Sequence, residues 1–222
     1  MKLVWSPELA SKAYIDTVKA CETINDSSVA ELISATAAGW NATLIVETWC
    51  QGNPIATSIG LTIASHHTNG KHICIVPNDE TAAVYIESMR IFTGETPDIL
   101  IGNPEQSAAA LTGIDFLVVD CGGGNELVEI LRVAKLGQRG AVLVCKNANL
   151  KTRSEFRWRS AFGGGSRRVV RTVFLPVGNG LEIAHVAAVG NSSGDGDGNG
   201  KRRSRWFKHV NPDSGEDYFI RK

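Results

Sequence analysis

The 222-residue chain has no apolar run of the length needed to cross a membrane, which is roughly 18 residues. Its start, Met1–Pro7, also lacks the apolar stretch of a signal peptide, so we expect a cytoplasmic protein with no membrane partner. None of its five cysteines form a CxxC pair, and four lie in or beside apolar runs. This pattern argues against a zinc site and favours reduced, buried thiols.

The chain also lacks an excess of charge of either sign. Lys plus Arg and Asp plus Glu number 23 each, so composition alone does not indicate a nucleic-acid-binding protein. Hydrophobic residues make up 43%, and a chain of 222 residues suits one globular domain with an appendage. The charge is nevertheless uneven, because residues 201–222 hold seven Lys or Arg against three Asp or Glu. A tail of this kind favours acidic partners.

Helix-start signals open the chain. Ser6 and Pro7 provide an N-cap and a first-turn proline. The helix that they predict has a regularly spaced inner face, made of Ala10, Ala13, Tyr14, Thr17, Val18 and Cys21. Ser28-x-x-Glu31 is a capping box, and it predicts a second helix to about residue 38.

From residue 43 onward, short apolar runs alternate with helix signals. We expect buried parallel strands at 43–47, 72–76, 98–101, 115–120 and 140–146. The intervening helices are expected from Asn53-Pro54 to His67 with Gly70 just past the end, from Asn78/Asp79 to Phe92, from Asn103-Pro104 to Leu111, and from Asn125 to Gly137. Five such alternations predict a doubly wound α/β fold.

The alternation ends in two strand-like runs, 169–177 and 181–189, separated only by Gly178-Asn179-Gly180. So short a connection forces antiparallel pairing. We therefore predict a mostly parallel seven-stranded sheet with a C-terminal antiparallel hairpin, as in Rossmann-like methyltransferases, whereas a dinucleotide-binding sheet more often adds a sixth parallel strand. Residues 1–190 would form this domain, 191–200 a flexible Gly/Asp linker and 201–222 a basic tail.

Ligands of open α/β sheets bind beyond the carboxyl ends of the strands. Two carboxylates are expected there, Glu47 after the first strand and Asp120 after the fourth. They would accept hydrogen bonds from the amine or hydroxyls of a cofactor, or serve only in local capping. Gly52 and Gly102 lie in neighbouring loops, where glycine allows close approach of a ligand but also occurs in plain turns.

Three segments resemble the caffeoyl-CoA type O-methyltransferases: residues 114–121 and 142–147 match their fourth and fifth strands, and 175–181 matches their terminal hairpin. With residues 2–7, 75–77 and 206–221, the whole chain is similar to a plant family of unknown function described as methyltransferase-like. The resemblance implies S-adenosylmethionine as cofactor and a small-molecule substrate. The implied cofactor-binding residues are Glu47, Thr48, Gly52, Asn78, Asp79, Gly102 and Asp120, and the implied catalytic residues are Asp120, Lys146 and Asn147.

The chain departs from active relatives at three places. Trp49 replaces the first glycine of the cofactor loop, and Pro77 replaces the acid that holds the ribose. Lys146 replaces the middle one of three metal ligands. We expect no metal site, because a charged lysine has no lone pair for a cation. Lys146 would instead pair with Asp120, or act as a base if burial lowers its pKa.

These observations leave two functions open. One is a metal-independent, S-adenosylmethionine-dependent methyltransferase, since proximity and orientation supply much of the rate of methyl transfer. The other is a non-catalytic binding or regulatory module that keeps the fold but has a degenerate cofactor loop. Oligomeric state is not predicted from these patterns.

A third function rests on basic residues interleaved with aromatic ones between Lys151 and Arg171. This region is expected near the rim of the site. It would grip the phosphates of a CoA ester, a nucleotide or RNA, or form only a solvated face. The basic run 201–205 would further suit nuclear import.

Overall fold

The computed structural model describes residues 4–24, 29–120, 126–148, 158, 168–188, 206–210 and 217–221. The chain divides into two compact units, Met1–Val189 and Gly190–Lys222. The second unit contains one antiparallel pair, β10 (Trp206–Val210) with β11 (Asp217–Arg221). The predicted linker 191–200 and the basic run 201–205 lie outside the described residues.

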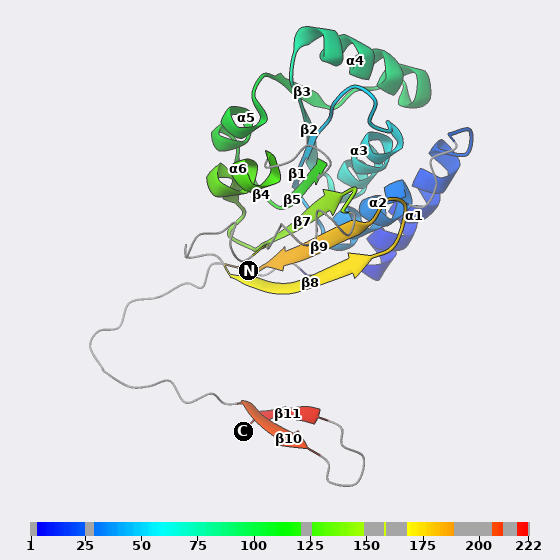
Figure 1. Cartoon of the computed structure of the whole chain (residues 1–222). Coiled ribbons are helices and arrows are strands. Elements are labelled where there is room, and N and C mark those ends of the chain that lie inside the picture. Colours follow the sequence, from blue (N-terminus) through cyan, green and yellow to red (C-terminus); the bar gives the residue numbers. More distant parts are fainter. Residues whose placement is uncertain are drawn as a thin grey trace. The chain divides into compact units, whose positions relative to one another are not determined.

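The first unit is built on a seven-stranded sheet of order β3-β2-β1-β5-β7-β9-β8 (Figure 1). Its strands are β1 (Leu44–Thr48), β2 (Lys71–Val76), β3 (Asp98–Ile101), β5 (Phe116–Asp120), β7 (Ala141–Lys146), β8 (Val169–Leu175) and β9 (Leu181–Val186). Strands β1, β2, β3, β5 and β7 are parallel, whereas β9 runs antiparallel to both β7 and β8. The predicted fold class, including the terminal hairpin, is confirmed.

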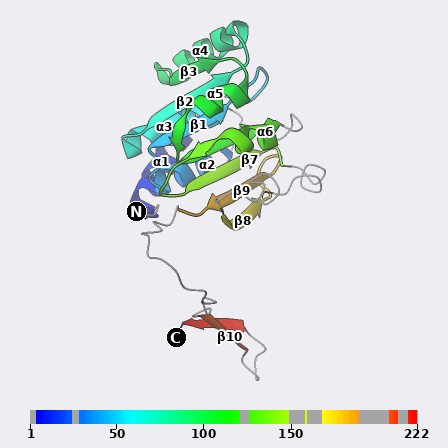
Figure 2. The ribbon, with the colours of Figure 1, turned by 90° about the vertical axis from the view of Figure 1, so that its left-hand side faces the viewer.

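Helices cover both faces of this sheet (Figures 1 and 2). One face packs against α1 (Pro7–Ala20), α2 (Val29–Gly39), α3 (Ala56–Thr68) and α4 (Asp79–Thr93). The other face packs against α5 (Pro104–Ala110) and α6 (Glu126–Val133). A short parallel pair, β4 (Thr112–Ile114) with β6 (Lys135–Leu136), was not predicted.

Burial on both faces explains the continuous apolar runs of the central strands. Every residue of β7 is buried, and side chains alternate between the faces. Val142 and Val144 pack on the side of α1, α2 and α3, whereas Leu143 and Cys145 pack on the side of α5 and α6.

Three helix starts, those of α1, α4 and α5, agree with the sequence signals. Ser6 Oγ accepts a hydrogen bond from Leu9 N, Asn78 Oδ1 accepts one from Thr81 N, and Asn103 Oδ1 accepts one from Gln106 N. The predicted cap Ser28 lies outside the described residues.

Three details of the helix predictions were wrong. Helix α3 begins at Ala56 after Ile55, whose side chain makes no capping bond, instead of being capped by Asn53. Helix α6 ends at Val133 because Lys135–Leu136 forms β6. Of the predicted inner face of α1, Tyr14 and Val18 are exposed, because the helix packs on a narrower stripe of small residues.

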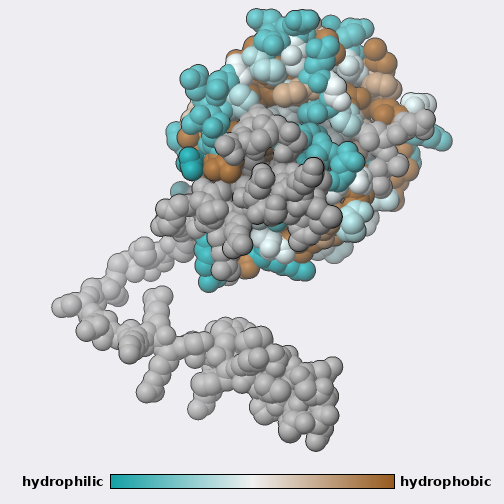
Figure 3. Space-filling view, in the orientation of Figure 1, coloured by the Kyte–Doolittle hydropathy of each residue, from teal (hydrophilic) through white to brown (hydrophobic). Residues whose placement is uncertain are grey.

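Over the described residues of the face seen in Figure 3, hydrophilic and hydrophobic side chains are interspersed. None of the helices in the described part of the chain combines the length and hydropathy needed to cross a membrane.

Candidate functional site

Three polar side chains reach the carboxyl ends of neighbouring strands. Glu47 lies on β1, Asp120 on β5 and Lys146 on β7, and the register pairs Asp120 with Lys146. Side chains two positions apart on a strand point to the same face of the sheet. The residues two positions before these three are Ile45, Val118 and Val144, and they pack in one cluster with α2 and α3. Glu47, Asp120 and Lys146 therefore point to the face that α2 and α3 cover. The structure therefore brings these predicted residues to one edge and one face of the sheet.

Glu47 is fully buried and is held through one carboxylate oxygen. Its Oε1 accepts a hydrogen bond of 3.1 Å from Tyr85 Oη and lies 3.1 Å from His72 Nε2, although this second contact lacks the alignment of a hydrogen bond. His72 Nδ1 lies 2.9 Å from Thr62 Oγ1. Burial raises the pKa of Glu47, but His72, followed by Lys146 and Ser58, outweighs burial and leaves that pKa below its usual value. Glu47 is thus a buried carboxylate stabilised from within the fold.

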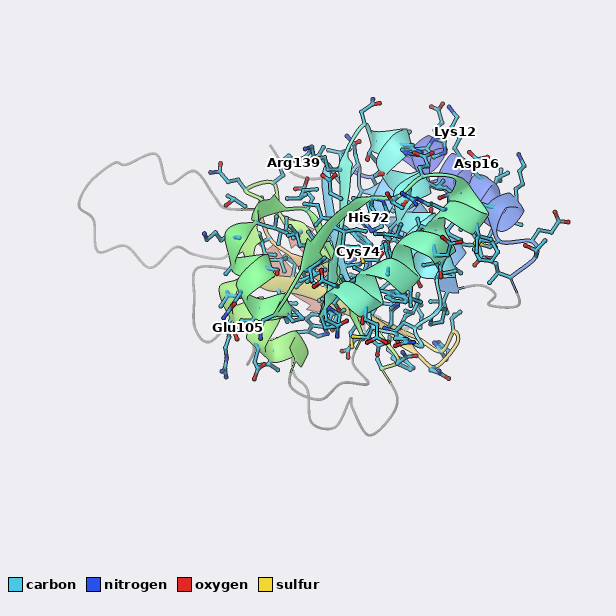
Figure 4. All side chains as sticks on the ribbon, turned by 90° about the horizontal axis from the view of Figure 1, so that it is seen from above. Lys12, Asp16, His72, Cys74, Glu105 and Arg139 are labelled. Carbon is cyan, nitrogen blue, oxygen red and sulfur yellow. The ribbon has the colours of Figure 1, made fainter. Side chains whose placement is uncertain are left out.

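The neighbours of Glu47 are held in their protonated forms. Burial and then the charge of Glu47 raise the pKa values of Cys74 and Tyr85 well above their usual values. Cys74 is the partner of Glu47 across β1 and β2, and His72 and Cys74 lie in the interior of the fold (Figure 4). The group formed by Glu47, His72, Cys74 and Tyr85, here called the Glu47 network, is a closed interior cluster.

Trp49 packs inward beside this network. Its side chain is 3% exposed, and its ring centroid lies 5.1 Å from that of Tyr85 at an interplanar angle of 62°. It belongs to a core cluster with residues of α3 and α4, among them Ile59, Ala82 and Met89. Trp49 therefore fills the space between these helices next to the ends of β1 and β2.

The other predicted cofactor contacts are dispersed along the loops. Thr48 is buried at the end of β1. Gly52 and Gly102 have φ of +93° and +138°, and a Cβ at either position would meet nothing within 4 Å, so backbone conformation and not crowding selects glycine there. Asn78 caps α4 and Asp79 is exposed in its first turn, so neither places a buried acid at the end of β2.

A cavity of about 200 Å³ opens at the carboxyl end of β7. It is lined by Pro54 and Thr57 at the start of α3, by Lys146 and Asn147, and by the turn between β8 and β9. Lys146 is 4% exposed, and its Nζ makes no hydrogen bond within the described residues. A buried ammonium without an acceptor beside a cavity is the arrangement expected of a group that meets an anionic ligand.

Asp120 and Asn147 lie at the same edge in a short chain of hydrogen bonds. Asn147 Nδ2 donates to Asp120 Oδ2 at 2.6 Å, and Asn179 Nδ2 donates to Asn147 Oδ1 at 3.2 Å. The predicted ion pair between Lys146 and Asp120 is not formed, because the amide of Asn147 bonds the carboxylate of Asp120 while Lys146 lines the cavity. Among the residues that the structure describes, no three His, Cys, Asp or Glu side chains are grouped as a metal site.

The expectation of uniformly reduced thiols was also wrong, because Cys145 is disulfide-bonded. Spacing along the chain does not reveal which thiols meet in space.

Several residues of the site were not predicted. The signal for His72 is a single polar residue in an otherwise apolar strand, and the signal for Tyr85 is its position between Ala82 and Met89 on the inner side of α4. Asn179 gave no signal beyond its place in a tight turn.

The basic region 151–171 is described only at Trp158 and from residue 168 onward. Arg168 and Arg171 lie at the start of β8. There, Val169 of β8 and Ala141, the first residue of β7, both pair with Val186 of β9, so the start of β8 lies at the amino end of β7. For these two residues the predicted position at the rim of the site was wrong, because the hairpin turns them to the opposite end of the sheet. The remaining basic residues of this region lie outside the described ones.

Comparison with known proteins places this geometry in context. Residues 1–222 match a family described as "Protein of unknown function (DUF1442)". A comparison with curated proteins finds no match.

Solved structures with a similar fold include several methyltransferases. One from Geobacter sulfurreducens is 21% identical with a TM-score of 0.54, and the match covers 79% of this chain and 88% of that one. The PaMTH1 methyltransferase of Podospora anserina, bound to S-adenosylhomocysteine, is 14% identical with a TM-score of 0.52, covering 83% and 89%. The O-methyltransferase TomG of Streptomyces achromogenes, in complex with S-adenosylmethionine, is 16% identical with a TM-score of 0.51, covering 84% and 92%. These similarities show the fold.

Proposed function

Because this chain belongs to the DUF1442 family of proteins of unknown function and has the methyltransferase fold, we propose that it binds S-adenosylmethionine and methylates a small molecule without a metal. The observation that supports this most directly is the cavity at the carboxyl edge, where Lys146 and Asn147 face the start of α3. Ligands of open α/β sheets bind at this edge.

The residues around the cofactor loop fit a bound S-adenosylmethionine in part. Gly52 and Gly102 have positive φ, and no atom lies within 4 Å of the position that a Cβ would take. This open space allows a ligand to approach the backbone there. Helix α3 has no side-chain cap at Ile55, so its first N–H groups are available to a carboxylate. When bound, the cofactor supplies an activated methyl group. Asn78 and Asp79 do not reproduce the usual acid for the ribose, so affinity would rest on the loop and on α3.

Lys146 is the group that we assign to the substrate. Its buried ammonium, which makes no hydrogen bond within the described residues, would hold an anionic oxygen of the substrate in the cavity. Holding that oxygen close to the methyl donor accelerates transfer mainly by proximity and orientation. This role of Lys146 is our reason for proposing a metal-independent reaction.

Two experiments test the proposal. Calorimetry measures the binding of S-adenosylmethionine and S-adenosylhomocysteine, and an activity assay measures transfer of a labelled methyl group into a mixture of small-molecule acids and phenols. We expect both ligands to bind, and Lys146→Met to keep cofactor binding but lose transfer. Lys71→Met, which changes an exposed lysine at the start of β2, is the matched control and should leave transfer intact. Absence of heat with either ligand at millimolar concentration would contradict the proposal.

A second candidate function is supported by Trp49 and Asn78. Trp49 is packed in the core at the position of a cofactor-loop glycine, and Asn78 is used as a helix cap. A non-catalytic binding module has no need of either position for a cofactor. If S-adenosylmethionine binds to Trp49→Gly but not to the unmodified chain, this second function is the correct one.

A further inference from the structure

A second and larger hollow lies at the opposite end of the sheet from the proposed methyl-transfer site. It is a groove of about 520 Å³ where β7 begins and β9 ends. Its lining includes Trp40, Arg139, Val142, Arg168, Arg171 and His185, and none of the described residues that line it is acidic. Its volume falls in the range of about 300–1,000 Å³ that is typical of small-molecule sites.

The charge of this groove is positive and only partly neutralised. Arg139 Nη2 lies 2.6 Å from Asp115 Oδ2 and also donates to Thr43 Oγ1 at 3.1 Å, so its position and charge are accounted for. Arg168 and Arg171 are exposed, and neither has an ion-pair partner within the described part of the chain. Two guanidinium groups without carboxylates favour phosphate, whose oxygens match their paired N–H donors.

The groove also presents an aromatic ring in a fixed position. The ring of Trp40 lies 5.1 Å from that of His185 and 5.4 Å from that of Trp5, edge-on in both cases. Arg171 pairs with His185 across β8 and β9, so the Arg171 side chain begins beside the His185 imidazole that contacts Trp40. Burial and then the charge of Arg171 lower the pKa of His185, so its imidazole is neutral at neutral pH. A held indole next to unpaired guanidinium groups suits a planar ligand that carries an anionic group.

We propose that this groove binds a phosphate-bearing planar molecule of the mononucleotide type, with its ring against Trp40 and its phosphate on Arg168 and Arg171. The site is independent of the proposed methyl transfer, because it lies at the amino end of β7 whereas Lys146 lies at its carboxyl end. Figure 4 likewise shows Arg139 at the margin of the fold, away from the interior residues His72 and Cys74.

Calorimetry on the full chain with ADP, adenosine and inorganic phosphate provides the first test. Because ring and phosphate act together in this proposal, ADP should bind at least tenfold more tightly than adenosine or phosphate alone. Failure of ADP to bind at millimolar concentration would overturn the proposal. Methyl transfer is not read in this experiment, so its outcome is separate from that of the proposed function.

Variants then locate the binding. Arg168→Ala combined with Arg171→Ala should weaken ADP binding at least tenfold, because the loss of even one hydrogen bond to a charged group typically lowers affinity by about that factor or more. Arg90→Ala, at an exposed arginine of α4, is the matched control and should bind ADP like the unmodified chain. Lys146→Met should also bind ADP unchanged. Equal affinity of the double variant and the unmodified chain would show that the groove is not the site.

A final comparison separates a small ligand from a polymer. A single-stranded RNA oligonucleotide should bind no more than about tenfold more tightly than ADP if the groove holds one nucleotide-sized molecule. Affinity that rises a hundredfold and grows with oligonucleotide length would overturn the small-molecule proposal and identify the groove as part of a nucleic-acid surface.

Discussion

The two halves of the carboxyl edge differ in how they treat buried charge. Next to β2, the carboxylate of Glu47 is bonded by Tyr85 and approached by His72, and Trp49 closes the space beside it. Next to β7, the ammonium of Lys146 has no hydrogen-bond partner in the described residues and lines a cavity. The charge of Glu47 is stabilised by neighbours that the fold supplies, whereas the charge of Lys146, although attracted by Glu47, makes no hydrogen bond within the described residues and lines a cavity where a ligand can reach it. We infer that the half of the edge around Glu47 stabilises the fold, whereas the half around Lys146 binds and positions a ligand.

The largest expected effect comes from removing the carboxylate of the closed half. Glu47→Ala should lower the free energy of unfolding by about 3–5 kcal/mol, because it leaves the buried Tyr85 hydroxyl without its acceptor and opens a cavity in the interior. Urea unfolding followed by circular dichroism measures this loss. Glu47→Gln, which keeps an acceptor for Tyr85, should lose less. A loss of under about 1 kcal/mol for the alanine variant would end the contrast between the two halves.

A smaller effect is expected at Asn147, which belongs to the open half. Its φ of +56° is a conformation that alanine adopts at a cost of about 1–2 kcal/mol, whereas glycine adopts it freely. Both Asn147→Ala and Asn147→Gly lose the bond to Asp120, so the difference between the two variants reports the backbone alone. Unfolding free energies of the two variants should therefore differ by about 1–2 kcal/mol, with alanine the less stable. Equal stabilities would contradict this backbone assignment.

Lys146→Met should change the free energy of unfolding by no more than about 1 kcal/mol in either direction. The substitution relieves the cost of burying a charge that makes no hydrogen bond within the described residues, but it also removes the attraction between Lys146 and Glu47, so the two effects oppose each other. The same urea experiment measures it, with Lys71→Met as the exposed control. A loss of several kcal/mol would show that Lys146 belongs to the framework of the fold and not to an open site.

The smallest effect sharpens the comparison through pH. The pKa of Glu47 in the folded chain lies below its ordinary 4.5. Its contribution to stability is therefore present above 4.5 and is lost as the pH falls through the lower folded value. As the pH is lowered below 4.5, the free energy of unfolding of the unmodified chain should fall more steeply than that of Glu47→Gln. Parallel curves would contradict the lowered pKa.

Strands and helices were predictable because their signals are local. The apolar runs of β1, β2, β3, β5 and β7, and the Gly178-Asn179-Gly180 turn, specify the sheet through neighbours close in sequence. The pair β4 and β6 escaped prediction because strands of two or three residues carry no recognisable period.

The site was predictable only as a list of strand ends. Glu47, Asp120 and Lys146 follow from strand positions, but their partners depend on contacts between distant segments. Tyr85 meets Glu47 across 38 positions of sequence. Lys146 and Asp120 are register partners, which favoured an ion pair, yet the left-handed turn at Asn147 accompanies an amide bond to Asp120 instead. Competition of this kind is decided by side-chain geometry, which the sequence does not display.

The place of β1 in the sheet also constrains the order in which the chain can mature on the ribosome. Strand β1 lies between β2 and β5, and Glu47 stands opposite Val118. At a synthesis rate of about 5–20 residues per second, the intervening stretch takes roughly 4 to 14 seconds to emerge. Throughout that interval the edge of β1 that β5 will cover has no partner strand, and an unpaired edge of this kind can pair with another chain.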